Sequence, residues 1–261
     1  MLSRADEWVE QVRSRPPTDD LMPGVIPAEP GIILLSGRTG IGKTNLLLQL
    51  AHSAATGKQF LGFELKKSKV GFLAFEGTDD KMADRLDKMQ RSFSPVGDNL
   101  LFARRSPRKL AGNEKEFFDS FKGVGLMIID PLKYLVAGDY TKPHPAHEFL
   151  GALMSLIADL KAPIILGHHI RKPDKRGLID PGEVYELKGA GDYVEAATSV
   201  LLLEREPQGH RPTGGYAPVN HDHQILYFAK ARDAVEALDP IPLRFDREKL
   251  LYIRRDTEVY T

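Results

Sequence analysis

The chain has 261 residues, of which 42% are hydrophobic and 28% are charged. This length suits one large α/β domain or two small ones, and the apolar fraction is ordinary for a buried core, so wholesale disorder is excluded. Basic and acidic side chains number 36 each, which excludes a surface coated in basic charge for bulk binding of nucleic acid or membrane, but not a local basic patch. There is no cysteine, which excludes disulfides, zinc fingers, thiolate nucleophiles and iron–sulfur clusters.

Residues 1–21 are predicted to form an N-terminal arm, because a short amphipathic pattern around Trp8, Val9 and Val12 is followed by closely spaced prolines. A partner-binding arm and a helix packed on the domain both stay open as interpretations. Acidic residues stand where a signal peptide would need an apolar run. No apolar stretch approaches the roughly 20 residues that span a bilayer. We therefore expect a soluble cytoplasmic protein that does not bind a membrane.

Residues 22–261 are predicted to form one domain, in which short apolar runs alternate with helical patterns from Gly31 onward. Such alternation is typical of a parallel sheet covered by helices on both faces. The expected strands are 32–36, 70–75, 100–103, 126–129, 164–167 and 199–203, and the expected helices are 43–56, 79–92, 114–122 and 146–160. Three later runs, at 224–230, 241–245 and 250–254, have no helix-length pattern between them. They predict an antiparallel extension of the sheet.

A glycine-rich segment after the first expected strand matches the phosphate-loop pattern G-x-x-x-x-G-K-[ST]. Glycines let successive backbone N–H groups curve round a phosphate, and the following helix N-terminus adds partial positive charge. Lys43 would reach the β- and γ-phosphates of ATP, and Thr44 would place its hydroxyl on Mg²⁺. The residues expected to contact the nucleotide are Gly37, Arg38, Thr39, Gly40, Ile41, Gly42, Lys43, Thr44 and Asn45.

Two carboxylates follow expected strands and are candidates for the hydrolytic chemistry. Asp130 ends an apolar strand, at the sheet edge where open α/β sheets bind ligands, and would hold Mg²⁺. A group is also needed to orient the attacking water. Pro131 occupies the position of a glutamate in many P-loop ATPases, so we predict that Glu76, at the end of another strand, is the catalytic carboxylate. A helix-entry role for Glu76 is the alternative, because Thr78 and the acids after it look like a capped helix start.

In their order along the chain, these motifs resemble those of the RecA-like ATPases, in particular RepA-type plasmid helicases and DnaB-type replicative helicases. The resemblance covers roughly residues 22–255. It rests on a lead-in at 22–27, the phosphate loop, Phe75-Glu76, Ile129-Asp130, Leu166-Gly167-His168-His169, the segment 188–202, and Ala229-Lys230-Ala231-Arg232-Asp233. One departure is Glu195, which stands where DnaB-type proteins have a glutamine that contacts phosphate or DNA.

The resemblance implies further site residues. One of the two adjacent histidines would sense the γ-phosphate; because side chains alternate along a strand, we prefer His168 over His169. Lys230 and Arg232, two residues apart on an expected strand, would reach as a finger into the nucleotide site of a neighbouring subunit. A solvated edge strand is the alternative for this pair.

A long segment, 170–190, is expected to be a loop that grips the phosphates of single-stranded DNA. Its place after the histidine strand matches the channel-facing loop of the family. The basic residues that would bind DNA are Arg171, Lys172, Lys175, Arg176 and Lys188. A solvated loop without a ligand is the alternative.

We therefore expect a RecA-like P-loop ATPase that uses ATP and Mg²⁺, assembles with itself into a ring, expected to be a hexamer, and moves along single-stranded DNA as a replicative helicase. A recombination or repair ATPase that forms filaments on DNA is one alternative. A nucleotide-gated assembly ATPase with no DNA role is another. A metabolic kinase is disfavoured, because no acceptor pocket motif is present and Lys230 and Arg232 would have no role in it.

Overall fold

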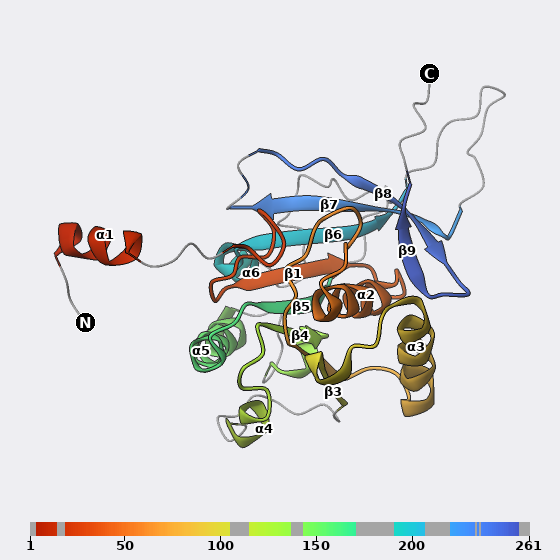
Figure 1. The fold of residues 1–261 in the computed structure, drawn as a ribbon, viewed down its shortest axis with the longest axis horizontal. Coiled ribbons are helices and arrows are strands. Elements are labelled where there is room, and N and C mark those ends of the chain that lie inside the picture. The colour runs from red at the N-terminus through yellow and green to blue at the C-terminus, as the bar shows by residue number, and fades with distance from the viewer. Residues whose placement is uncertain are drawn as a thin grey trace.

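The computed structural model describes residues 4–14, 19–104, 115–136, 143–170, 191–206, 220–232, 234 and 236–255. Within these residues, nine strands form one sheet in the order β3-β2-β4-β5-β1-β6-β7-β8-β9 (Figure 1). The strands are β1 Ile32–Gly37, β2 Val70–Ala74, β3 Leu100–Arg104, β4 Leu126–Asp130, β5 Ile164–His169, β6 Ser199–Arg205, β7 His223–Ala231, β8 Ile241–Asp246 and β9 Leu251–Arg254.

The first six strands of the chain are parallel, and the last three extend the sheet in antiparallel fashion. Strand β1 lies between β5 and β6, with Gly37 level with His169 on one side and Leu203 on the other. The parallel strands β1, β2 and β4 are buried along their whole length, as expected for strands covered on both faces. The predicted fold class, a mainly parallel sheet with a C-terminal antiparallel extension, is confirmed.

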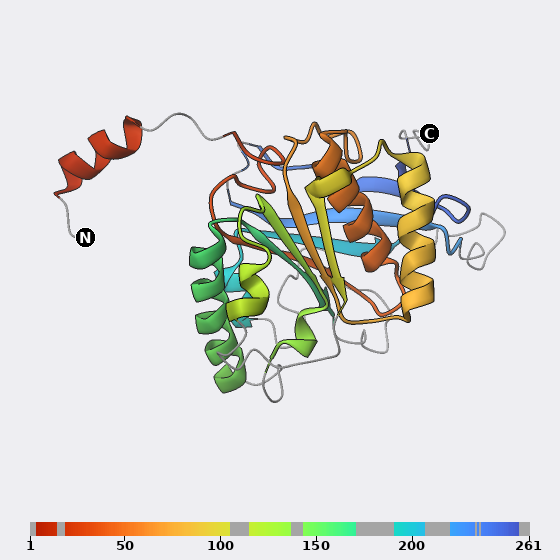
Figure 2. The same ribbon diagram turned by 60° about the horizontal axis from the view of Figure 1, so that its bottom comes forward.

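Helices cover both faces of the sheet (Figure 2). Helices α2 (Lys43–Thr56) and α3 (Asp79–Ser92) lie on one face, and α4 (Lys115–Asp119), α5 (Pro143–Leu160) and α6 (Gly191–Ala196) lie on the other. Helix α3 starts where the sequence predicted, because the Thr78 side chain accepts a hydrogen bond from the Lys81 backbone N–H. The expected helix 114–122 is shorter, ending at Asp119.

Two short 3-10 helices and the N-terminal helix α1 complete the fold. The 3-10 helices are η1 (Gly97–Asn99) and η2 (Leu132–Tyr134), and η2 follows β4 directly. Helix α1 (Ala5–Arg13) has no buried residue, and Trp8 is 54% exposed. Figure 1 draws α1 away from the sheet. Within the described residues, no helix is both long and apolar enough to cross a membrane.

Candidate active site

The phosphate loop joins β1 to α2 at the carboxyl end of the parallel strands. Gly40 and Gly42 have φ angles of 77° and 105°, in the left-handed region that favours glycine. At Gly42 a second constraint applies, because a Cβ there would overlap the Tyr252 hydroxyl. The loop therefore depends on glycine both for its backbone path and for the close approach of β9.

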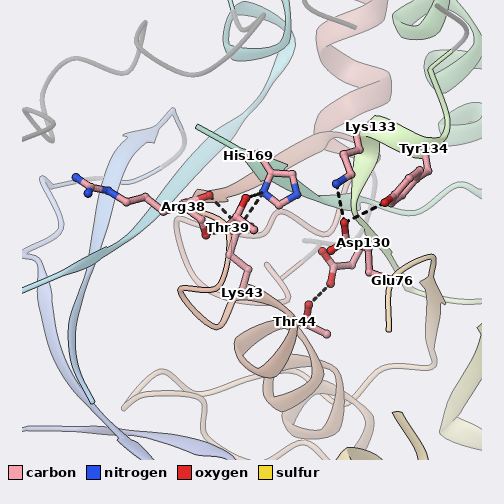
Figure 3. Close-up of polar contacts among 10 residues, drawn as sticks. Arg38, Thr39, Lys43, Thr44, Glu76, Asp130, Lys133, Tyr134 and His169 are labelled. Atoms are coloured by element: carbon pink, nitrogen blue, oxygen red, sulfur yellow. Dashed lines mark hydrogen bonds and ion pairs between the residues drawn. The ribbon is translucent and has the colours of Figure 1, made fainter. Parts of the chain in front are cut away.

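Lys43, at the start of α2, is buried and turned toward the loop (Figure 3). Its ammonium donates hydrogen bonds to the carbonyl oxygens of Gly37 at 2.8 Å and Arg38 at 2.9 Å, and its Nζ lies 3.3 Å from Nδ1 of His169. Burial lowers the pKa of Lys43 to about 8, although the carboxylates of Asp130 and Glu76 act in the opposite direction. The site thus contains one buried cation directed at the loop that is expected to hold phosphates.

Asp130, at the end of β4, lies beside the first turn of α2. The Thr44 hydroxyl donates a hydrogen bond of 2.5 Å to its Oδ2. Burial raises the pKa of Asp130, and the Thr44 hydrogen bond and the charge of Lys43 offset this in part. A carboxylate and a hydroxyl at this distance form the oxygen-rich, charge-bearing donor set that Mg²⁺ prefers. The two residues named from the sequence as metal ligands therefore fit that ion.

Glu76 follows β2, the neighbour of β4 in the sheet. Its Oε1 lies 2.6 Å from the Lys133 ammonium and accepts a hydrogen bond of 3.2 Å from the Tyr134 hydroxyl (Figure 3). Burial raises the pKa of Glu76, but Lys133, His169 and Tyr134 together outweigh it, so the pKa lies below its usual value. Glu76 is therefore an ionised carboxylate near Asp130 and Lys43, where a catalytic carboxylate would be required. Thr78, and not Glu76, provides the side-chain cap of α3.

The two histidines of β5 point to opposite faces of the sheet. His169 lies at the loop, with its Nδ1 3.4 Å from the Thr39 hydroxyl and 3.3 Å from Lys43. His168 is 1% exposed and packs on the α5–α6 face, with its ring 6.0 Å from that of Tyr193. The expectation that His168 faces the nucleotide is therefore corrected in favour of His169, because the register that aligns Gly37 with His169 sends the ring of His168 into the other core.

A family profile described as an AAA domain matches residues 2–175, which is more than half of the chain. The chain belongs to this AAA domain family. No curated protein is significantly similar to it. Among solved structures, the ATPase domain of G40P aligns with a TM-score of 0.67 and 13% identity over 98% of this chain and 100% of that one. The flagellar accessory protein FlaH from Methanocaldococcus jannaschii aligns with a TM-score of 0.56 and 14% identity over 98% of each chain. The fold is that of RecA-like P-loop ATPases, and the AAA domain protein is a nucleotide-binding ATPase.

Lys230 and Arg232 of this AAA domain protein lie near one end of β6, and the phosphate loop lies near the other end. Lys230 pairs with Val200 near the start of β6, while the loop begins beside Leu203 near its end. Each strand residue advances the chain about 3.3 Å, so Lys230 and the start of the loop are separated by about 10 Å or more along the strands. Lys230 donates to the carbonyl oxygen of Val194 at 2.5 Å, and Arg232 donates to that of Glu195 at 2.8 Å. Both cations therefore lie at the C-terminal end of α6 and not at the nucleotide site of their own chain.

Several residues at the site were not found from the sequence. The Tyr252 hydroxyl, from β9, donates to the carbonyl oxygen of Ile41 in the loop at 2.9 Å, and the Gln49 side chain exchanges two hydrogen bonds with the Tyr252 backbone. Arg38 pairs with buried Glu204 of β6 at 3.2 Å. Lys133 and Tyr134 lie in η2, shortly after Asp130, and this closeness in sequence is the one signal that pointed to them.

The basic residues predicted to bind DNA, Arg171, Lys172, Lys175, Arg176 and Lys188, lie outside the described residues. Asn45 occupies the first turn of α2, and its Oδ1 is buried. Gly37, Arg38, Thr39, Gly40, Ile41, Gly42, Lys43 and Thr44 form one continuous loop and helix start, as the motif requires.

Proposed function

We propose that this protein is a ring-forming motor that hydrolyses ATP at the interfaces between its subunits and moves along single-stranded DNA, as a replicative helicase does. The observation that carries the proposal is the position of Lys230 and Arg232. Two neighbouring cations repel each other, and within the described residues neither forms an ion pair with a carboxylate. An anion supplied from outside the chain, such as the γ-phosphate bound by an adjacent copy, would stabilise both.

The residues of one subunit would divide the chemistry in the following way. Lys43 and the backbone N–H groups of the loop bind the β- and γ-phosphates. Thr44 and Asp130 would hold Mg²⁺, which would neutralise charge on the phosphates. Glu76 would orient the attacking water and accept its proton, and His169 would contact the γ-phosphate oxygens. The finger of the neighbouring subunit then stabilises the charge of the transition state, a contribution of about 10³-fold or more in rate.

The DNA part of the proposal is supported by the order of the motifs, which resembles that of RepA-type and DnaB-type helicases, and by the basic residues between 171 and 188. Net charge is zero over the whole chain, so affinity for DNA would come from this local patch and would fall steeply with salt. The proposal therefore predicts binding that is modest and salt-sensitive.

The test is to measure ATP hydrolysis with and without single-stranded DNA, alongside solution mass by light scattering. We expect a mass of about six subunits, hydrolysis that DNA accelerates, and separation of a forked duplex. The variant Lys43→Met provides the baseline for contaminating activity. A monomer that ignores DNA would contradict the proposal. Hydrolysis that depends on DNA without strand separation would favour a recombination or repair ATPase, and an oligomer indifferent to DNA would favour a nucleotide-gated assembly ATPase.

A further inference from the structure

Lys133 and Glu76 form an ion pair inside the nucleotide site. The Lys133 ammonium lies 2.6 Å from Oε1 of Glu76, and the two side chains are 28% and 40% exposed. Lys133 belongs to η2, the single turn that follows Asp130, so it extends from the same segment that carries the metal ligand. The sequence did not predict this pair, and Lys133 has no part in the mechanism of hydrolysis proposed for the site.

Two donors from η2 converge on one oxygen of Glu76. Oε1 accepts both the Lys133 ammonium and the Tyr134 hydroxyl, which lies 3.2 Å away (Figure 3). A carboxylate that acts as a base must present a lone pair to water, and it works best when its pKa lies near the working pH. Both donors lower the pKa of Glu76, against the effect of burial. The contacts therefore weaken Glu76 as a base while they hold it in place.

We propose that Lys133 is a positioning residue that restrains the Glu76 carboxylate and releases it to the attacking water when the γ-phosphate of bound ATP attracts the lysine ammonium. The inference rests on the proposed function, because it takes Glu76 as the catalytic carboxylate. Its effect is to slow hydrolysis, because in the ATP-bound protein the lysine ammonium is shared between Glu76 and the γ-phosphate, and Glu76 is free only while the ammonium lies on the phosphate.

The electrostatics of the site favour this exchange. Burial accounts for most of the lowering of the Lys43 pKa, and the Lys133 charge lowers it further, so the two ammonium groups act on the same region of the site. A γ-phosphate carries more negative charge than one carboxylate and accepts charge-assisted hydrogen bonds on several oxygens. Because Lys133 is part exposed on a flexible stem, its ammonium can leave Glu76 by rotation of the side chain alone.

In the hydrolytic step that follows, the γ-phosphoryl group of ATP is transferred to water. The water oxygen forms a bond to the γ-phosphorus while the bond from that phosphorus to the β–γ bridging oxygen breaks. ADP leaves with the electron pair of the broken bond, and the proton lost by water goes to the released Glu76 carboxylate. Lys133 remains protonated throughout and supplies no atom to the product.

The experiment is single-turnover hydrolysis, with the full-length protein in excess over ATP and without DNA, so that product release does not mask the chemical step. Lys133→Met removes the charge and keeps the length of the side chain. We expect it to raise the rate about fivefold, which is the effect of losing a partly exposed ion pair. Lys133→Arg should hydrolyse ATP at the rate of the parent, because arginine keeps a positive charge that can pair with Glu76. ADP affinity should be unchanged in both, which shows that the site is intact.

A matched control is Lys122→Met, since Lys122 pairs with Asp119 at 2.8 Å outside the site. It should leave the rate unchanged. Tyr134→Phe removes the second donor to the same Glu76 oxygen and should raise the rate by a smaller factor. A rate in Lys133→Met equal to or below that of the parent overturns the proposal.

Failure of this inference is distinguishable from failure of the proposed function through Glu76→Gln. If that variant turns over ATP at the parent rate, Glu76 is not the catalytic carboxylate and both ideas fail. If Glu76→Gln is inactive and Lys133→Met is no faster than the parent, only the restraint by Lys133 is wrong.

Discussion

The Thr44 hydroxyl and the Asp130 carboxylate are joined by a hydrogen bond of 2.5 Å, although 86 residues separate them in sequence. The contact connects the first turn of α2 to the end of β4. It exists because β1, which leads into the phosphate loop, and β4 both end on the same side of a parallel sheet, where ligands bind in open α/β folds. A buried carboxylate is costly to keep charged, and a single hydroxyl compensates only part of that cost.

Asp130→Asn should therefore separate stability from function. Because burial raises the Asp130 pKa, the folded protein binds this proton more tightly than the unfolded chain. The stability gained from this proton is present below the pKa that Asp130 has in the unfolded chain. It is lost as the pH rises toward the pKa that Asp130 has in the folded protein. Asparagine carries no charge at any pH, so Asp130→Asn does not lose this stability at neutral pH. We therefore expect the variant to have a higher melting temperature than the parent.

The same variant should lose its response to Mg²⁺. Calorimetric titration with ADP, with and without Mg²⁺, should give equal affinities for Asp130→Asn and a clear increase with Mg²⁺ for the parent. Asp119→Asn, on the surface, serves as the control. A lower melting temperature in Asp130→Asn would mean that the carboxylate charge stabilises the fold, and a retained Mg²⁺ response would remove Asp130 from the metal site.

Arg232 lies near the start of β6 and Glu76 follows the carboxyl end of β2, and this separation predicts complementation between defective subunits. Arg232→Ala lacks one of the two proposed finger residues but keeps the proposed catalytic residue Glu76, and Glu76→Gln has the reverse defect. If the finger acts across an interface, mixing the two inactive proteins creates some interfaces with both groups intact. We expect ATP hydrolysis to reappear on mixing and to depend on the mixing ratio.

Two controls accompany this measurement. Glu76→Gln mixed with a double variant, Glu76→Gln with Arg232→Ala, should remain inactive at every ratio. Arg232→Ala also removes a hydrogen bond to α6, with a cost of about 1 kcal/mol in the free energy of unfolding, so thermal unfolding must show that the variant is folded. Absence of recovery in a mixture that forms mixed oligomers would contradict a finger in trans.

The sequence predicted those parts of the site that depend on local order along the chain. The phosphate loop, Asp130 and Glu76 each directly follow an apolar strand, and parallel strands place their carboxyl ends together. The choice between His168 and His169 was wrong for a definite reason. Alternation shows that only one of them faces the loop, but which one depends on how β5 aligns with β1, and that register is a property of the assembled sheet.

Other contacts could not be predicted because they join distant segments. Gln49 and the Tyr252 backbone are 203 residues apart, and the pattern around Tyr252 predicts only a strand. Lys133 is close to Asp130 in sequence, but its direction is set by the 3-10 turn η2, which has no distinctive pattern. Lys230 lies in β7, but Arg232 lies just beyond the end of that strand, and the contacts of both with α6 depend on the packing of the whole extension.

The two histidines should respond differently to truncation. His169→Ala removes a side chain at the loop, and we expect turnover to fall about tenfold or more while the melting temperature changes little. His168→Ala leaves a cavity against Tyr193, and we expect a loss of about 2–4 kcal/mol in the free energy of unfolding with turnover largely retained at low temperature. Denaturant unfolding and steady-state kinetics on both variants check this, and a reversed pattern would restore His168 as the residue at the nucleotide.

The packing of Tyr252 on the phosphate loop predicts that two substitutions will be coupled. Tyr252→Phe removes the hydrogen bond to the Ile41 carbonyl oxygen, and we expect ADP affinity to fall about fivefold, as for one lost hydrogen bond near 1 kcal/mol. Gly42→Ala should be far more damaging, because its φ of 105° disfavours alanine and the new methyl group overlaps the Tyr252 hydroxyl.

Without that hydroxyl, part of the overlap disappears. The double variant, Gly42→Ala with Tyr252→Phe, should therefore bind ADP more tightly than the sum of the two single effects on the binding free energy predicts. Phe245→Leu, which alters a neighbour of Tyr252 in the same core but not the loop contact, is the packing control. Strict additivity in this cycle would show that Tyr252 supports the loop only through the backbone of β9 and that its hydroxyl has no part in shaping the phosphate site.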